Sequence, residues 1–129
     1  MFYLQRFINT QNSGGLYDNM TDYQTALQEI RAGHKKTHWI WYVFPQMKGL
    51  GKSNLSEYYV INGREEAYEY IANPVLRDRL VEATEAVLNN EHSAYDIFGN
   101  DVIKFRACML LFASISDIPV FRQVLAKYK

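Results

Sequence analysis

The stretch that decides the fold is "TDYQTALQEIRAG", residues 21–33. Its apolar side chains recur at i, i+3, i+4 and i+7, the spacing of one face of an α-helix, at Tyr23, Ala26, Leu27 and Ile30. The sequence Thr21-Asp22-Tyr23-Gln24 fits a capping box at the start of this helix. Gly33 stands where helices often end on a glycine with a left-handed backbone. We therefore predict a helix that begins after Thr21 and ends before Gly33.

The same periodicity continues on both sides of this helix. Asn73 followed by Pro74 marks another helix start, because asparagine caps helix N-termini and proline is tolerated in the first turn. Asp101 is predicted to cap a long helix, and Asp117 with Pro119 to begin the last one. These further helices are predicted over approximately residues 4–11, 62–71, 74–88, 93–98, 102–112 and 119 to near the C-terminus.

The segment "THWIWYVFPQ", residues 37–46, fits this pattern less clearly. Alternation would place every second residue from Trp39 onward on one side, as in a β-strand. Alternatively, Thr37 would cap a short buried helix that ends at Pro45. A lone strand is not stable, and the sequence offers no convincing partner strand. We therefore predict a helix in this segment.

The composition indicates a globular domain. The chain has 129 residues, of which 48% are apolar, so it can bury a substantial core without disulfides. No internal repeat, low-complexity tract or linker interrupts it. The predicted fold is therefore all-α, a compact single domain over residues 1–129 with about six to seven helices.

Charge and cysteine content narrow the function. Lys plus Arg and Asp plus Glu are 14 each, so wholesale binding to nucleic acid or an anionic membrane is not indicated. The single Cys108 excludes an intrachain disulfide, and no Cys and His spacing predicts a metal site. Neither a signal peptide nor a membrane span is predicted. We expect a cytoplasmic protein without a cofactor, whose oligomeric state the sequence leaves open.

The sequence "GLGKS" at residues 49–53 raises the question of a phosphate-binding loop. A Walker loop requires a glycine where Gln46 stands, and it lies between a strand and a helix. The sequence meets neither condition, which excludes the loop of a nucleotide hydrolase. A turn is the simpler explanation of Gly49 and Gly51, because glycine adopts backbone angles that other residues avoid.

The residues around this segment are nevertheless of the types found in nucleotide-binding sites. The stretch "HKKTHWIWYVFPQMKGLGKS", residues 34–53, combines cations, aromatic rings and glycines. Backbone N–H groups of a glycine-rich loop can hold an anion, and aromatic rings stack on bases. The candidate ligand-binding residues are Lys35, Lys36, Thr37, His38, Trp39, Trp41, Phe44, Gln46, Gly49, Gly51, Lys52, Ser53 and Lys104.

The stretch "ALQEIRAGHKKTHWIWYVFPQMKGLGKS", residues 26–53, closely resembles the DUF1810 family of small proteins of unknown function. Its pattern runs roughly A-L-x-E-[IL]-x-x-G-x-K-x-[ST]-H-W-x-W-x-[IV]-F-P-Q-x-x-G-L-G-x-S. The resemblance extends to "LQRF" at 4–7, "EEAYEYIANPVLRDRL" at 65–80 and "DVIKFRACMLLF" at 101–112. It implies a compact, mainly helical domain and no established reaction. Members have been labelled calpastatin-like, and nothing in this sequence supports protease inhibition.

The chain also departs from this family. Members usually continue past the last helix into a short segment, whereas this chain stops at "VLAKYK". If that segment covers a pocket in relatives, we expect the pocket to be more open here.

Several candidates also have a purely structural explanation. His38 is an acid–base or phosphate-binding group, or else a histidine that hydrogen-bonds to the backbone. At least one of Trp39 and Trp41 is expected to belong to the core. For Lys104, an ion pair with Asp101 is the favoured explanation over a bound anion.

These observations favour a binding protein that holds or sequesters a small phosphorylated ligand of the nucleotide or ADP-ribose type. The first alternative is a hydrolase acting on the same class of ligand, with His38 as its acid or base and no other catalytic residue identified. The second alternative is a protein–protein interaction module formed by exposed tyrosines and the GLGKS segment. The sequence identifies neither the ligand nor its fate.

Overall fold

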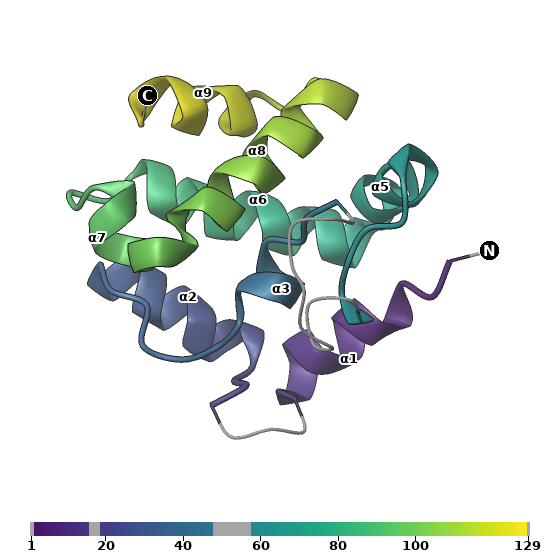
Figure 1. The fold of residues 1–129 in the computed structure, drawn as a ribbon, viewed down its shortest axis with the longest axis horizontal. Coiled ribbons are helices and arrows are strands. Elements are labelled where there is room, and N and C mark those ends of the chain that lie inside the picture. The colour runs from purple at the N-terminus through teal and green to yellow at the C-terminus, as the bar shows by residue number, and fades with distance from the viewer. Residues whose placement is uncertain (1, 16–18, 48–57, 129) are drawn as a thin grey trace.

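The structure is a computed structural model that describes residues 2–15, 19–47 and 58–128. Its helices are α1 (Gln5–Ser13), α2 (Tyr23–Ala32), α3 (Ile40–Val43), α5 (Arg64–Ala72), α6 (Pro74–Leu88), α7 (Ala94–Phe98), the 3-10 turn η1 (Gly99–Asp101), α8 (Val102–Ile115) and α9 (Pro119–Lys127) (Figure 1). Among these described residues, β-pairing is limited to an isolated parallel bridge between Met47 and Ile61. The predicted all-α multihelical fold is confirmed.

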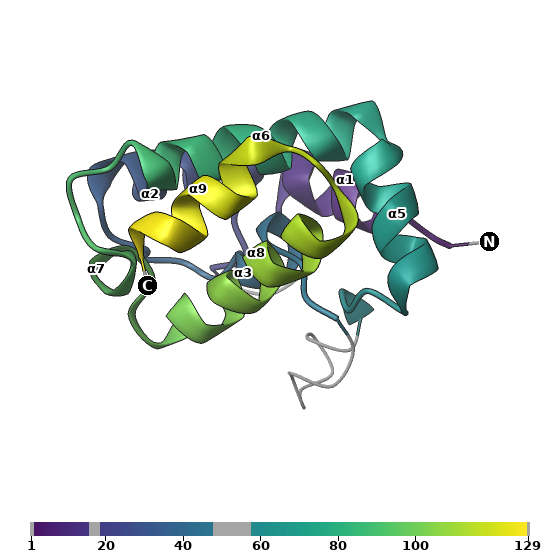
Figure 2. The same ribbon diagram turned by 90° about the horizontal axis from the view of Figure 1, so that it is seen from above.

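Helix α6 is the longest at 15 residues and occupies the middle of the molecule. Helices α8 and α9 lie on one side of it, and α1, α2 and α3 lie on the other (Figures 1 and 2). Helix α5 packs across one end of α6. The apolar faces meet in one core, whose largest fully buried members include Phe7, Ile30, Trp39, Tyr70, Leu76, Phe112 and Phe121.

Several helix ends follow the predicted signals. The Asn73 side chain, a predicted cap, accepts hydrogen bonds from two N–H groups in the first turn of α6. Ser93, for which no cap was predicted, accepts one from the N–H of Asp96 at the start of α7. Gly33 ends α2 with φ of 87°, in the left-handed region that favours glycine. The four predicted apolar positions of α2 are all buried. Local sequence signals therefore define these elements.

The predicted caps of α2 and α8 are wrong. Asp22, not Thr21, caps α2, because its carboxylate accepts from the N–H of Thr25 at 2.9 Å. The hydroxyl of Thr21 hydrogen-bonds to that of Thr37 instead. Asp101 gives no side-chain cap to α8, because its backbone is itself helical, with φ −73° and ψ −2°, whereas a capping residue needs an extended backbone.

Helix α3 confirms the prediction of a helix in residues 37–46, although it spans only four residues. Thr37 does not cap it, since Trp39 occupies the N-cap position. After Val43 the chain leaves the helix and runs to the bridge at Met47. In the described ranges, no helix is both long and apolar enough to cross a membrane.

Candidate functional site

The carboxylate of Glu29 organises the loop that carries most of the candidate residues. Its Oε1 accepts hydrogen bonds from the N–H of Lys36 at 2.7 Å, the N–H of Thr37 at 3.0 Å and Nε1 of Trp39 at 2.9 Å. Its Oε2 accepts from the Thr37 hydroxyl at 2.7 Å. We call these four residues the Glu29 network. It fixes the backbone between α2 and α3, along which the exposed Lys36 and His38 alternate with less exposed residues.

The same hydrogen bonds determine the charge of Glu29. Burial alone would raise its pKa, but the bonds from Trp39, Thr37 and the two backbone N–H groups outweigh burial. The pKa therefore lies below its usual value of 4.5. A carboxylate that is ionised at neutral pH suits four donors, because hydrogen bonds to charged groups are stronger than neutral ones.

Two of the predicted aromatic residues belong to the core. Trp39 and Phe44 are both fully buried. Their rings lie 6.1 Å apart and contact Phe98, whose ring stacks on Phe105 at 4.4 Å. The expectation that at least one tryptophan is a core residue is confirmed by Trp39. A ligand cannot reach either ring without opening this core.

Two of the predicted lysines converge on one carboxylate. Asp101 lies 3.0 Å from Nζ of Lys35 and 3.1 Å from Nζ of Lys104. Burial would raise the pKa of Asp101, but the hydrogen bonds from the two lysines lower it overall. Lys35 has only 8% of its side chain exposed, and its ammonium lies 5.2 Å from the centre of the Trp39 ring. The ion pair of Lys104 favoured from the sequence is therefore present.

Gln46 is also engaged within the protein. It is buried, and its side-chain amide donates to the carbonyl of Phe44. The backbone carbonyl of Gln46 accepts a hydrogen bond from the N–H of Ile61 at 2.8 Å. These contacts join the end of the aromatic segment to the strand-like residues before α5. The structure thus gives Gln46 a place in the fold rather than on the surface.

Lys36, His38 and Trp41 remain outside the core. Lys36 and His38 are exposed, and Trp41 is half-buried. The rings of His38 and Trp41 lie 6.3 Å apart at 34° to one another. The backbone of His38 is fixed, because its N–H donates to the carbonyl of Asn19 and its carbonyl accepts from the hydroxyl of Tyr42, both at 2.7 Å. We call these three side chains the Lys36–Trp41 surface.

The remaining candidates, Gly49, Gly51, Lys52 and Ser53, fall outside the described residues. Their role in a phosphate-binding turn stays a prediction from the sequence. Within the described ranges, no group of three or more His, Cys, Asp and Glu side chains is arranged to hold a metal ion.

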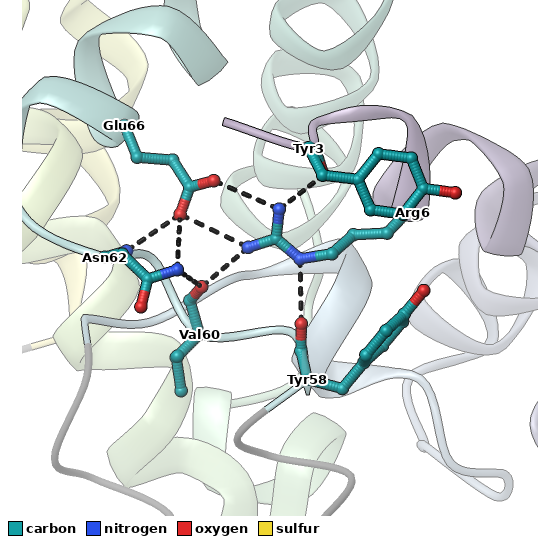
Figure 3. A network of polar contacts seen from close by, with 6 residues as sticks. All are labelled: Tyr3, Arg6, Tyr58, Val60, Asn62 and Glu66. Carbon is teal, nitrogen blue, oxygen red and sulfur yellow. Dashed lines mark hydrogen bonds and ion pairs between the residues drawn. The ribbon is translucent and has the colours of Figure 1, made fainter. Parts of the chain in front are cut away.

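A second polar network, absent from the predicted site, joins α1 to α5 (Figure 3). The guanidinium of Arg6 pairs with both carboxylate oxygens of Glu66, at 3.0 and 3.2 Å, and both side chains are buried. Arg6 also donates to the carbonyls of Tyr3, Tyr58 and Val60. We call this cluster, which also includes Asn62, the Arg6 network.

The Arg6 network holds the residues that precede α5. The N–H and the side-chain amide of Asn62 both donate to Oε1 of Glu66, at 2.8 and 3.2 Å. Sequence reasoning missed this pair, although a signal was present. Arg6 lies one turn before the buried Thr10 on α1, and Glu66 one turn before the buried Tyr70 on α5, so both charges fall on the buried faces of their helices.

A hollow of about 670 Å³ lies between α2, the end of α6 and the loop that follows. Its lining includes Arg31, Glu82, Glu85, Glu91 and His92. None of these residues belongs to the predicted site. Three carboxylates against one arginine make this hollow unsuited to a phosphorylated ligand, because like charges repel.

The fold and the two networks define the class of this protein. The chain belongs to the DUF1810 family, described as a protein of unknown function, and matches it over residues 1–129. The segments joined by the Glu29 and Arg6 networks are pieces of the pattern by which the sequence resembles that family. The family assignment predicted from the sequence is therefore confirmed.

Among solved structures, the chain is similar to the conserved hypothetical protein Rv1873 from Mycobacterium tuberculosis. The two are 39% identical and superpose with a TM-score of 0.87. The match covers 97% of this chain and 86% of the other. No curated protein sequence matches the chain significantly.

Proposed function

We propose that this protein binds a small, flat, phosphorylated ligand, of the nucleotide or ADP-ribose type, on the Lys36–Trp41 surface. The observation that carries the proposal is an exposed cation, Lys36, near the exposed His38 and the half-buried Trp41, on a loop whose backbone is held by Glu29, Asn19 and Tyr42. A fixed backbone lowers the entropy lost when a ligand orders its binding site.

The roles of the three side chains follow from their chemistry. The half-exposed indole of Trp41 offers a π-face on which a base stacks. Lys36 supplies a positive charge for a phosphate, and the imidazole of His38 donates a hydrogen bond to the same group. In this proposal the ligand is held or sequestered, and the location is cytoplasmic, where such ligands occur.

The candidates that are already engaged within the protein take a supporting role in the proposal. Thr37 and Trp39 donate hydrogen bonds to Glu29, and Lys35 and Lys104 form ion pairs with Asp101. Their contribution is to shape the loop rather than to contact the ligand. A substitution at these positions should therefore change binding only together with stability.

The test is thermal unfolding of the purified protein with nucleotides, cyclic nucleotides and ADP-ribose derivatives. A ligand present at 100 times its dissociation constant should add about 2.7 kcal/mol to the free energy of unfolding. Since stacking on an aromatic side chain is worth about 1–3 kcal/mol per base, Trp41→Ala should weaken binding roughly 5- to 150-fold. Trp41→Phe should retain most of the affinity.

Two matched controls separate this surface from the rest of the molecule. Tyr95→Ala removes an aromatic side chain that is 63% exposed on α7, and Arg77→Ala removes an exposed cation from α6. Both should bind the ligand as the wild type does. If no compound stabilises the protein, or if Trp41→Ala and Lys36→Ala bind as tightly as the controls, the proposal is wrong.

The ligand recovered after incubation decides between binding and turnover. Intact ligand supports a binding or sequestering protein. If the wild type alters the ligand chemically and the His38→Ala variant does not, the result supports the alternative of a hydrolase in which His38 acts as the acid or base.

A further inference from the structure

The charges of this chain are unevenly distributed although its formal net charge is zero. Residues 102–129, which contain α8 and α9, hold five Lys or Arg residues and one Asp, a balance of +4. Residues 64–91, which contain α5 and α6, hold three Arg and seven Asp or Glu, a balance of −4. The layer formed by α8 and α9 in Figure 1 therefore carries an excess of basic residues, although Lys104 is paired with Asp101 just before α8.

Apolar side chains face solvent on this basic layer. Ile103 is 68% exposed and Leu110 is 52% exposed, both on α8. Arg106 is exposed and Ala107 half-buried between them. The spacing i, i+3, i+4 and i+7 places all four on one face of the helix. Two exposed large apolar side chains on one helix face mark an interaction surface where they are part of a continuous patch.

A small apolar hollow adjoins the stripe. It has a volume of about 40 Å³ and lies among α7, α8 and α9, with Val102, Phe105 and Leu125 in its lining. Since a water molecule occupies roughly 10–15 Å³ by the same measure, the hollow has room for about three methyl-sized groups. Arg106 both lines this hollow and belongs to the stripe, so the two features form one surface.

We propose that this surface, consisting of Ile103, Arg106, Ala107, Leu110 and the adjoining hollow, docks an acidic amphipathic helix of a protein partner. An amphipathic helix presents apolar anchors at i, i+3 or i+4, and i+7. Those anchors fit the spacing of the stripe and the adjoining hollow. Carboxylates beside the anchors match the charge of Arg106 and of the basic layer, which favours correct encounter over other partners.

The experiment is selection of a phage-displayed library of random 16-residue peptides on the wild-type protein. Peptides that also bind the Ile103→Lys/Leu110→Lys double variant are removed. The expected peptides have apolar residues at helical spacing and an excess of Asp and Glu. Synthetic copies should lose at least 10-fold in affinity for either single variant and for Arg106→Glu. Val75→Lys, at an exposed apolar position on α6, should bind as the wild type does.

Exchange of the charge provides the sharpest control. A selected peptide remade with Lys in place of its acidic residues should bind Arg106→Glu better than it binds the wild type. Peptides without acidic enrichment, or no enrichment at all, would overturn the proposal. All variants are first compared with the wild type in thermal unfolding, and the substituted side chains are exposed, so folding should be retained.

Two other occupants are distinguished by separate measurements. If sedimentation of the protein alone shows a dimer that Leu110→Lys dissociates, the surface pairs with a second copy, whose α5–α6 region supplies the acidic charge, and the proposal is wrong. If the protein instead sediments with phosphatidylserine vesicles and selects no acidic peptide, the surface binds lipid.

Discussion

Two carboxylates, Glu29 and Glu66, hold two non-helical stretches of this fold by different means. Glu66 faces a cation, and each of its oxygens accepts a hydrogen bond from Arg6. Glu29 faces four neutral donors, three of them on Oε1 and only the Thr37 hydroxyl on Oε2. The first carboxylate must supply negative charge, whereas the second must supply one strong acceptor.

This difference predicts opposite responses to glutamine, which keeps the shape of glutamate and loses its charge. At position 66, either orientation of the amide points an NH₂ group at Arg6, itself a donor. At position 29, the NH₂ group can take the place of Oε2 and donate to the hydroxyl of Thr37. That hydroxyl can then donate to Thr21, whose oxygen lies 2.9 Å away.

The largest effect is expected for Glu66→Gln. Removing one partner of a buried ion pair leaves an uncompensated charge, which costs about 3–5 kcal/mol. The free energy of unfolding in urea should fall by this amount, with an unchanged dependence on urea concentration. The double variant Arg6→Met/Glu66→Leu should lose less than the two single variants together. It should still not recover fully, because three backbone carbonyls lose their hydrogen bond from Arg6.

Additive losses for Arg6→Met and Glu66→Leu, within about 0.5 kcal/mol, would contradict this account, since residues that interact directly are coupled. They would mean that the two side chains stabilise the fold separately. A loss below about 1 kcal/mol for Glu66→Gln would likewise show that charge is not what this position requires.

At position 29, alanine and glutamine should differ. Glu29→Ala leaves the buried indole N–H of Trp39 without an acceptor, and we expect a loss of about 2–3 kcal/mol. Glu29→Gln should cost about 1 kcal/mol, the difference between charged and neutral hydrogen bonds. Urea unfolding of both variants measures this. Equal losses would show that the charge of Glu29, rather than its acceptor position, stabilises the loop.

The pH dependence gives an independent check on Glu29. Its pKa is lower in the folded than in the unfolded protein, so its contribution is fully present above about pH 4.5 and is lost as the pH falls through the folded value. Asp101 acts in the same direction. The difference in stability between the wild type and Glu29→Gln should therefore narrow below pH 4.5.

The sequence predicted what depends on neighbours along the chain. Asn73 and Gly33 act on N–H or carbonyl groups a few residues away, so a local pattern identifies them. The start of α2 was misplaced by one residue only because two adjacent side chains, Thr21 and Asp22, can both cap a helix. Helix existence was thus predictable, and exact boundaries depended on which neighbour is the better acceptor.

The candidate site was less predictable, because its residues are sorted by contacts across the fold. Trp39 and Trp41 are two residues apart and chemically identical, yet one is fully buried and the other half-exposed. Glu29, ten residues away along the chain, accepts a hydrogen bond from the indole N–H of Trp39 and so satisfies this polar group in the core. Arg6 and Glu66 are 60 residues apart. No pattern within either helix identifies the residue on the other helix with which the charge pairs.

A smaller effect is expected at Asp101, where one partly exposed carboxylate faces two lysines. Asp101→Asn leaves Lys35 and Lys104 to repel one another and should cost about 1 kcal/mol. Lys104→Met should cost less, because 30% of its side chain is exposed. Raising the salt concentration from 50 mM to about 1 M should reduce the loss in Asp101→Asn, since salt screens the repulsion. A loss unaffected by salt would point to a packing role for Asp101.

The smallest effect on stability is expected for the residues that the Glu29 network leaves outside the core. Lys36→Ala and His38→Ala remove exposed side chains and keep the backbone hydrogen bonds, so each should change the free energy of unfolding by less than about 0.5 kcal/mol. Thr37→Ala, between them, loses its bond to Glu29 and should cost about 1 kcal/mol or more. Urea unfolding of the three variants compares them directly. If Lys36→Ala or His38→Ala lowers the free energy of unfolding as much as Thr37→Ala does, the side chain concerned stabilises the fold as Thr37 does. A loss at Thr37 alone would mean that stability accounts for Thr37 and leaves Lys36 and His38 available to a ligand, which is the separation of roles that the proposed function requires.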